Sequence, residues 1–374
     1  MIFWSMLIVI AYASLLLWFL WGLNEKSLAA PISGDYFPKV SVIVAARNEE
    51  KGISSLLASL CQQSYPQSNY ELIIVNDRST DGTVDVVNAF REKSKIIHLL
   101  HITETHEGWA PKKWALNCAI KESNGELLLF TDGDCVPSET WIAAMIEEFS
   151  DKSVGFVSAP APLSNKKGII DDLFLLDSLA QDGFSAGGIG HGIALSCTGR
   201  NMGIRRSVFD EVNGYEGING FISGDDDLLL QKVASLTSSK VSFRLKSDAV
   251  VSSPPPDKIS TFIHQRLRFT SKGLSYYQLD TTPGMKMILP LLYITNIVVL
   301  FSMLHVMGGG GISALLPWGL KSIIDGAYSY RIFRLLEIRW RIEAFFILSV
   351  LHPIYVTVFG GVGPFVNIQW KTNE

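Results

Sequence analysis

The stretch Glu126–Asp134 reads ELLLFTDGD, and it decides the fold that we expect. Its short, unbroken apolar run LLLF is typical of a strand that is buried on both faces of a sheet. Two carboxylates, Asp132 and Asp134, follow the run with one glycine between them. A turn at the end of such a strand brings both carboxylates within reach of one divalent cation. The alternative is an aspartate turn that binds no ligand.

Three more apolar runs precede this one, and stretches with a helical pattern separate them. This alternation of strand and helix is typical of a parallel sheet with crossover helices, which binds ligands at the carboxyl ends of its strands. We therefore expect an α/β catalytic domain over residues 38–256. The other expected strands are Val40–Ala46, Glu71–Asp77 and Ile96–Ile102, and the expected helices end near Cys61, begin near Thr83 and cover Pro111–Ser123.

The apolar residues of the chain are concentrated at its two ends. Hydrophobic residues make up 48% of the 374 residues, and the mean hydropathy is +0.24. Ile2–Leu23 is uncharged and long enough to cross a bilayer as a helix, so residues 1–25 are expected to form an anchor. A cleaved signal peptide is the alternative, but no basic residues precede the run. Lys26 follows it, which favours a cytoplasmic catalytic domain.

A second apolar region occupies residues 286–374. Met287–Met307 and Ala344–Val366 are long enough to span a membrane, and Gly311–Ile323 is a weaker candidate, so we expect two or three spans here. The sequence thus predicts an integral protein of a bacterial-type inner membrane, with the lipid bilayer as a partner. The arginines between the spans indicate a cytoplasmic loop; they are Arg331, Arg334, Arg339 and Arg341.

Charge and cysteine content exclude some other classes of protein. The chain has 32 Lys and Arg against 36 Asp and Glu, a net charge of −4, so nucleic acid is not an expected partner. Its four cysteines form no CxxC pair, and their spread fits free thiols in a reducing compartment.

Polar residues near the strand ends and helix starts are candidates for donor binding. Asp77 is expected to hydrogen-bond a nucleotide base, with an Asx turn as the alternative. Asp81 is expected to cap the next helix rather than to bind a ligand. Lys112 and Lys113 open a helix, where one of them approaches the donor phosphates or both are solvated.

Asp225, Asp226 and Asp227 precede the apolar run Leu228–Leu230. One of them can act as the general base that deprotonates an acceptor hydroxyl, with Asp226 the first choice and Asp225 the second. Alternatively, all three stabilise the amino end of a helix through its dipole. The loop Gly199-Arg200-Asn201 is glycine-flanked and is expected to approach a sugar or the acceptor.

Residues 257–280 are expected to contain an amphipathic helix, either on the membrane surface or packed on the catalytic domain. It carries Gln265 and Arg268 on one face. Arginine binds two oxygens of a diphosphate at once, so this face, and less strongly Arg266, is expected to contact the donor. The alternative ligand is the anionic headgroup of a lipid.

These pieces form an ordered set of motifs. In chain order they are SVIVAARNEE (Ser41–Glu50), IIVNDRSTDGT (Ile73–Thr83), PKKWALN, FTDGD, GRNMGIRRSVFDEVNGY (Gly199–Tyr215), GDDDLLL and QRLRF.

The set resembles family 2 glycosyltransferases, which have the GT-A fold, over most of Val40–Phe269. Its membrane pattern is similar to that of ceramide glucosyltransferase-like and related bacterial members. The resemblance implies inverting transfer of a sugar from a nucleotide-sugar donor, UDP rather than GDP, to a membrane lipid acceptor, with Mg²⁺ or Mn²⁺. The implied donor-binding residues are Ala46, Arg47, Glu49, Asp77, Lys112, Asp132, Gln265, Arg266 and Arg268. The implied metal ligands are Asp132 and Asp134, the base is Asp226 or Asp225, and the acceptor region includes Gly199, Arg200, Asn201 and Phe269.

The chain departs from the family pattern in two places. Asp225 stands where the family often has Glu, which bears on the identity of the base, and Phe269 stands where it commonly has Trp. In polymer-making relatives that Trp lines the acceptor site. A processive polysaccharide synthase coupled to export is therefore a second interpretation, and a catalytically inactive scaffold is a third. The motifs encode neither the sugar, nor the acceptor, nor the oligomeric state.

Overall fold

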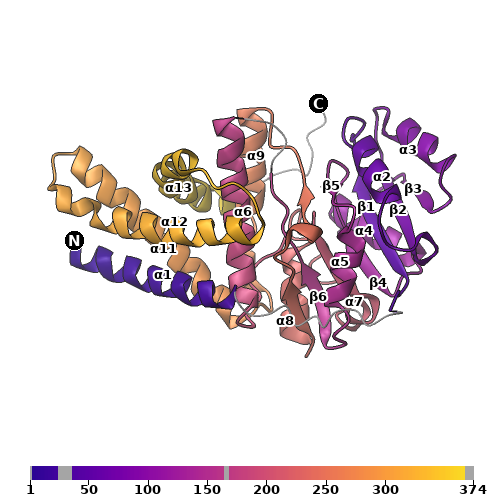
Figure 1. Ribbon diagram of the computed structural model, residues 1–374, viewed down its shortest axis with the longest axis horizontal. Coiled ribbons are helices and arrows are strands. Elements are labelled where there is room, and N and C mark those ends of the chain that lie inside the picture. Colours follow the sequence, from indigo (N-terminus) through magenta and orange to yellow (C-terminus); the bar gives the residue numbers. More distant parts are fainter. Residues whose placement is uncertain (1, 24–35, 164–167, 367–374) are drawn as a thin grey trace. The chain divides into compact units, whose positions relative to one another are not determined.

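The computed structural model describes residues 2–23, 36–163 and 168–366 (Figure 1). They group into two compact units. One holds the described residues of Met1–Glu25, Lys166–Leu195 and Pro255–Ile368, and the other holds those of Lys26–Asn165 and Ser196–Pro254. The second unit corresponds to the expected α/β domain, except that Lys166–Leu195 interrupts it and belongs to the first. Lys26, on which the expected sidedness rests, lies outside the described residues.

The α/β unit is built on a seven-stranded sheet in the order β3-β2-β1-β4-β7-β6-β8. Parallel pairing joins β1 to β2, β2 to β3, β1 to β4 and β6 to β8, whereas β7 is antiparallel to β4 and β6. The expectation of a mostly parallel sheet is confirmed. The strands are β1 Val40–Ala46, β2 Tyr70–Asp77, β3 Ile97–Ile102, β4 Leu127–Phe130, β6 Val154–Ser158, β7 Met202–Arg205 and β8 Lys240–Phe243, and a separate ribbon pairs β5 Val136–Pro137 with β9 Val251–Ser252.

Helices cover both faces of this sheet, which explains why β1 and β4 are buried along their whole length. Val42 and Val44 of β1 share one core with Leu56 and Leu57 of α2, whereas α4 contacts β1 and β2 outside that core. Successive side chains of a strand point to opposite faces. The helices of the unit are α2 Ile53–Cys61, η1 Gln67–Asn69, α3 Thr83–Arg91, α4 Pro111–Glu122, α5 Trp141–Glu148, α7 Arg206–Glu211, α8 Asp227–Leu236 and η2 Ser247–Ala249.

The other unit is entirely helical in its described part. Helices α1, α11 and α12 run side by side (Figure 1), and α6 approaches α12 so closely that a Cβ on Gly183 would lie 1.9 Å from Ile332 Cδ1. Its helices are α1 Ile2–Gly22, α6 Ile169–Ile189, α9 Ile259–Thr270, α10 Ser275–Gln278, α11 Pro283–Met307, η3 Ile312–Leu315, α12 Leu316–Leu335, α13 Ile342–Val362 and η4 Gly363–Phe365.

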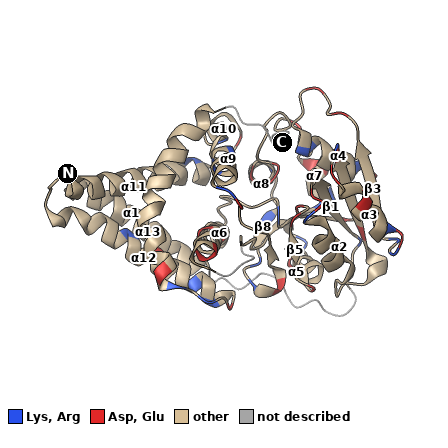
Figure 2. Cartoon of the chain, turned by 90° about the horizontal axis from the view of Figure 1, so that it is seen from above, with Lys and Arg blue, Asp and Glu red and all other residues tan. Residues whose placement is uncertain are grey.

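Three helical segments of the described chain are long and apolar enough to cross a membrane: Ile2–Gly22, Pro283–Met307 and Ile342–Phe365. Figure 2 shows the ribbon of α1 in tan throughout, without a charged residue. The weaker expected span falls on η3 and α12, and α12 carries Lys321 and Asp325, joined by an ion pair. By length and composition, two candidate spans therefore follow the catalytic domain in the sequence.

Candidate functional site

The expected site residues follow strands that end at one edge of the sheet. In the parallel register Ala46 is opposite Asn76, and Ile43 is opposite Phe130. Arg47, Asp77 and Asp132 therefore follow, or end, three adjacent strands that run in the same direction. Arg47 Nη1 lies 3.9 Å from Asp77 Oδ2. Parallel sheets bind their ligands at this edge.

Asp77 has one carboxylate oxygen that is available to a ligand. Its side chain is fully buried, and its Oδ1 accepts a hydrogen bond of 2.7 Å from Arg78 Nε. Its Oδ2 is buried without a hydrogen-bond partner among the described residues. An unpaired buried acceptor costs about 1–3 kcal/mol, so a ligand N–H at Oδ2 would bind favourably.

The loops after β1 and β2 are held together by hydrogen bonds. Asn48 adopts a left-handed backbone conformation, φ 54°, in which its Oδ1 accepts 2.8 Å from Thr80 N. Glu49 N donates to Thr83 Oγ1 over 2.8 Å. Asp81 accepts from Thr83 N and Glu50 N. Burial would raise the pKa of Asp81, but hydrogen bonds from Thr83 and from backbone amides outweigh it and lower that pKa. The N-cap of α3 is Gly82, so Asp81 lies one residue before the expected capping position and joins the first amide of α3 to the loop after β1.

Two glycines allow the turn that carries Asp132 and Asp134 to pack closely. A Cβ on Gly133 would lie 2.7 Å from Glu49 Cγ, and a Cβ on Gly52 would lie 2.8 Å from Asp134 Cα. A side chain at either glycine would push the turn away from the loop after β1. Glu49 is thus brought next to the turn that carries the two aspartates.

Lys112 lies between the two acidic clusters. Its Nζ is 2.9 Å from Asp132 Oδ1 and 2.9 Å from Asp225 Oδ2, and its side chain is 11% exposed. Burial would lower the pKa of Lys112, but the two carboxylates outweigh it and raise the pKa above its ordinary value. The first turn of α4 thereby places a permanent cation beside both clusters.

The second cluster precedes α8. Asp226 caps that helix, because its Oδ1 accepts 2.7 Å from Asp227 N, and its Oδ2 accepts 2.9 Å from Gly199 N. A Cβ on Gly199 would lie 3.0 Å from Asp225 Oδ2, so glycine permits this close approach. Asp225 is 5% exposed, whereas Asp226 is half-buried. The cluster thus combines a helix cap with carboxylates beside the Gly199 backbone.

Sequence reasoning missed Tyr215, which lies near this cluster. Its hydroxyl is buried and has no hydrogen-bond partner among the described residues. Burial raises the pKa of Tyr215, and the negative charges of Asp225 and Asp226 raise it further. The motif Gly199–Tyr215 ends on this residue, but the motif does not indicate which groups surround it, because that depends on how α7 and α8 come together.

Arg200 and Asn201, expected near the acceptor, have structural partners. Asn201 is fully buried, accepts from Trp141 Nε1 over 2.9 Å, and donates to Pro160 O and Ala249 O over 2.7 Å each. Arg200 Nη1 hydrogen-bonds Ser253 Oγ. The placement of Asn201 argues against direct contact with an acceptor, because both of its amide hydrogens are used inside the protein.

The residues expected to contact the diphosphate from the helix after the catalytic domain lie on α9, in the helical unit. Arg266 Nη2 makes an ion pair of 2.6 Å with Asp177 of α6, and both side chains are 7% exposed. The Arg266 guanidinium also lies 5.1 Å from the ring centroid of Phe262. Arg266 therefore joins α9 to α6. Gln265 Oε1 is buried without a hydrogen-bond partner among the described residues.

Arg268 and Phe269 are more accessible than Arg266. Arg268 is half-buried, and its guanidinium lies 5.3 Å from the ring centroid of Phe269, which is 37% exposed. The contact of Gln265 and Arg268 with a diphosphate stays a prediction.

Asp132 and Asp134 supply the carboxylate oxygens that a divalent cation prefers as ligands. Both are half-buried carboxylates, and Mg²⁺ and Mn²⁺ prefer such oxygen ligands. Within residues 2–23, 36–163 and 168–366, no group of three or more His, Cys, Asp or Glu side chains is arranged to hold a metal. The pair therefore fits an ion whose other ligands are donor phosphates and water, which is how Mg²⁺ is commonly bound.

Comparison with known proteins identifies the family to which the matched part of the chain belongs. Residues 41–212 match the sequence model of Glycosyl transferase family 2, and this part of the chain belongs to that family. A solved mannosyltransferase, PcManGT from Pyrobaculum calidifontis in complex with GDP-Man and Mn²⁺, superposes with a TM-score of 0.59 at 18% identity, covering 96% of this chain and 97% of that one. This likeness shows the fold, which is the expected GT-A fold.

Two curated proteins are similar in sequence. The probable glycosyltransferase YdaM of Bacillus subtilis is 30% identical over 199 residues, which cover 52% of this chain and 45% of YdaM. A beta-monoglucosyldiacylglycerol synthase of Synechocystis sp. is 25% identical over 306 residues, covering 74% of this chain and 60% of that protein. The chain thus spans less than two thirds of the length of either relative.

Proposed function

We propose that the protein is a membrane-anchored glycosyltransferase that moves a sugar from a nucleoside diphosphate sugar to a lipid acceptor. The observation that carries this proposal is Lys112, which joins Asp132, at the end of a strand, to Asp225, beside the expected base. One buried cation therefore lies next to both a donor-binding carboxylate and the cluster that would activate the acceptor.

The Oδ2 of Asp77, which accepts no hydrogen bond among the described residues, supports a uracil nucleotide. Because Arg78 donates to Oδ1 and Arg47 lies 3.9 Å from Oδ2, Asp77 offers a base one oxygen, Oδ2, that accepts no hydrogen bond. Uracil presents a single N–H between its two carbonyl groups, and this matches one acceptor. Guanine presents two adjacent N–H donors, which suit a carboxylate with both oxygens open. UDP-sugar is therefore the proposed donor.

Asp132 and Asp134 would hold the divalent cation, and Lys112 would stabilise negative charge beside it. When bound, Mg²⁺ or Mn²⁺ would supply positive charge to the diphosphate as it leaves. Lys112 remains protonated because two carboxylates raise its pKa. Arg268 and Gln265 are the proposed contacts from α9.

The acceptor hydroxyl would be activated by Asp226 or Asp225. The carboxylate takes the hydroxyl proton while the acceptor oxygen forms a bond to the anomeric carbon of the sugar. The bond from that carbon to the phosphate oxygen breaks, and the nucleoside diphosphate leaves with the electron pair. Attack opposite the leaving group inverts the configuration at the anomeric carbon.

A lipid acceptor is supported by the helical segments that surround the catalytic domain in the sequence. Three of them have the length and composition of membrane spans, and the Synechocystis relative is named as a synthase of a glucosyl lipid. Basic residues beside the expected spans support a cytoplasmic catalytic domain in a bacterial-type inner membrane.

The test is release of nucleoside diphosphate by the purified protein from a panel of UDP- and GDP-sugars. Each reaction contains Mg²⁺ or Mn²⁺ and is run with and without a bacterial lipid extract. We expect release with one UDP-sugar, stimulation by lipid, and a new glycolipid in the extract. If no donor is consumed in the presence of lipid, the proposal fails, and the inactive scaffold takes its place.

A further inference from the structure

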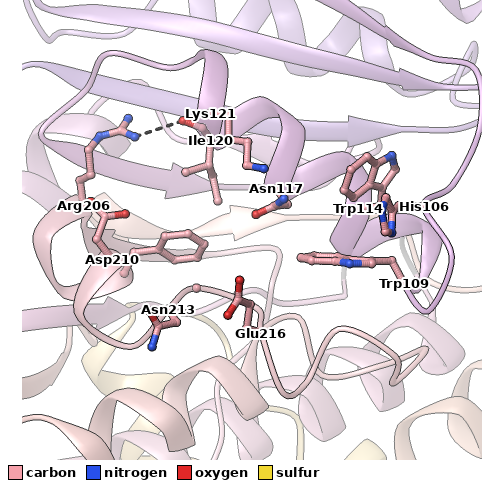
Figure 3. A pocket seen from close by; sticks show the side chains of 12 residues that line it. His106, Trp109, Trp114, Asn117, Ile120, Lys121, Arg206, Asp210, Asn213 and Glu216 are labelled. Atoms are coloured by element: carbon pink, nitrogen blue, oxygen red, sulfur yellow. Dashed lines mark hydrogen bonds between the residues drawn. The ribbon is translucent and has the colours of Figure 1, made fainter.

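A pocket in the α/β unit lies between α4 and the segment from Arg206 to Glu216 (Figure 3). Its volume is about 540 Å³, within the range of about 300–1,000 Å³ that is usual for small-molecule sites. Some of its lining residues belong to the motifs PKKWALN and Gly199–Tyr215, but the expectations above give those residues no role. The residues that line it are His106, Trp109, Trp114, Asn117, Ile120, Lys121, Arg206, Phe209, Asp210, Asn213, Gly214 and Glu216.

Aromatic rings form one wall of this pocket. Trp109 and Trp114 meet edge to face with centroids 5.4 Å apart, and His106 lies 5.1 Å from Trp114. Both indoles are half-buried. In the described part of the chain, neither indole N–H donates a hydrogen bond to the protein. A ligand can therefore stack on an indole ring and also accept a hydrogen bond from its edge.

The backbone holds Trp109 in place before any ligand arrives. Ala110 N donates 2.8 Å to Asn219 O, and Asn219 Nδ2 donates 2.9 Å to Gly108 O. Gly108 has φ 78°, a conformation that favours glycine and turns the chain just before the indole. A ring held by such a loop loses little entropy on binding.

Polar side chains face this aromatic wall. In Figure 3, Asn117 points into the pocket from α4, and Glu216 points towards it from the opposite side. Asp210 and Asn213 add another carboxylate and another amide at the rim. Such groups accept and donate the hydrogen bonds that sugar hydroxyls require.

The charges around the pocket favour a neutral ligand. Asp210 and Glu216 balance Lys121 and Arg206. Arg206 is already engaged, because its guanidinium donates to the backbone oxygens of Gly125, Ile120 and Ser123. A phosphate would meet two carboxylates, and a cation would meet Lys121 and Arg206. A pyranose has an apolar C–H face for the indole and neutral hydroxyls for the rim.

We propose that this pocket is a saccharide-binding site, separate from the edge of the sheet where the donor binds. Helix α4, which contributes Trp114 and Asn117 to the pocket, also connects it to the expected catalytic residues. Lys112 lies in the first turn of α4, and Lys113 Nζ donates 2.9 Å to Ser223 O, two residues before Asp225. The identity of the ligand rests on the proposed function: it is the sugar of an acceptor lipid that is already glycosylated.

The experiment measures saccharide binding directly, without donor or metal. The full chain is placed in nanodiscs of phosphatidylcholine and phosphatidylglycerol, because maltoside detergents would compete for the site. Saturation-transfer difference NMR is then recorded with a panel of methyl hexopyranosides and disaccharides. We expect saturable binding of at least one of them in the millimolar range.

Variants locate the bound saccharide. Trp109→Ala should weaken binding at least tenfold, and Glu216→Gln severalfold, because the first removes the stacking ring and the second only a charged acceptor. Trp21→Ala, at a tryptophan that is 71% exposed on α1, is the matched control and should bind as the wild type does. Circular dichroism melting of each variant checks that it is folded.

Nucleoside diphosphate release is measured on the same samples. If the wild type consumes donor and binds no saccharide, or if folded Trp109→Ala and Glu216→Gln bind undiminished, the pocket proposal is overturned while the proposed function stands. Saccharide binding that Trp109→Ala abolishes, with no donor consumed, would support the pocket and overturn the proposed function.

Discussion

The ammonium group of Lys112 lies 2.9 Å from Asp225 Oδ2, although the two residues are far apart in the sequence. The same nitrogen is 2.9 Å from Asp132 Oδ1. Without this cation, the buried Asp225 and the half-buried Asp132 would each lose an ion-pair partner. The turn that is expected to bind the donor and the expected catalytic cluster therefore depend on one side chain from a third element, α4.

Replacing Lys112 by Met should lower turnover at least 100-fold, because positive charge is lost both at the leaving group and between the two carboxylates. Nucleoside diphosphate release under saturating donor measures the effect. Lys93→Met, at an exposed lysine after α3, is the control and should keep wild-type turnover. Turnover within threefold of wild type in Lys112→Met would show that Lys112 has no catalytic part.

The stability supplied by Lys112 should not depend on pH in the neutral range. The pKa of Lys112 in the folded state is raised above its ordinary value of about 10.4, because the carboxylates of Asp132 and Asp225 outweigh the effect of burial. A raised pKa means that the contribution is fully present below about pH 10 and is lost only as pH rises through the folded-state pKa. The difference in melting temperature between wild type and Lys112→Met should therefore be constant from pH 7 to about pH 9. A difference that shrinks within this range would contradict the assignment.

Substitution at the two candidate base residues should distinguish them. Asp226→Asn keeps an oxygen that can accept from Asp227 N, so α8 should stay capped. It should bind donor with a Kd within about twofold of wild type and lose transfer by about 10²–10⁴-fold, the usual contribution of a general base. Asp225→Asn should also weaken donor binding, because it releases Lys112. Isothermal titration with UDP-sugar and a transfer assay measure both. Full transfer by Asp226→Asn would move the base to Asp225.

Asp134→Ala should raise the Mn²⁺ concentration for half-maximal donor consumption at least tenfold, because only two carboxylates are expected to hold the ion. Glu139→Ala, near the same turn but outside the motif, is the control. An unchanged metal requirement in Asp134→Ala would show that the motif forms a turn without a metal.

Arg266 and Arg268 should behave differently although they lie on the same helix. Arg266→Met leaves the buried Asp177 with hydrogen bonds from Gln181 and Tyr355 but without a cation, and breaking a buried ion pair costs about 3–5 kcal/mol. Its melting temperature should therefore fall clearly, and the double variant Asp177→Asn/Arg266→Met should recover part of the loss. Arg268→Met should melt near the wild type and raise the KM for the donor. A normal KM in Arg268→Met would remove that residue from the donor site.

Much of the fold could be predicted because strand and helix patterns are local. β1 and α3 begin at the residues that their patterns predict. Both ends of β2, β3 and α4 lie within one residue of the predicted ends. β4 is shorter than its motif, ending at Phe130, because the chain turns at once into the acidic residues. The α6 segment was not distinguished from the catalytic domain, since its sequence does not say which helices it packs against.

The sequence by itself determined the α/β class, the acidic edge of the sheet and the apolar segments of membrane length, because each depends on the periodicity or composition of neighbouring residues. Tertiary structure alone decided that Lys112 joins Asp132 to Asp225, that Arg266 is buried against Asp177, and that Trp109 and Glu216 share a pocket. These relationships pair residues from separate elements. They form only when burial of apolar side chains brings particular faces of these elements together and the polar groups on those faces pair with one another.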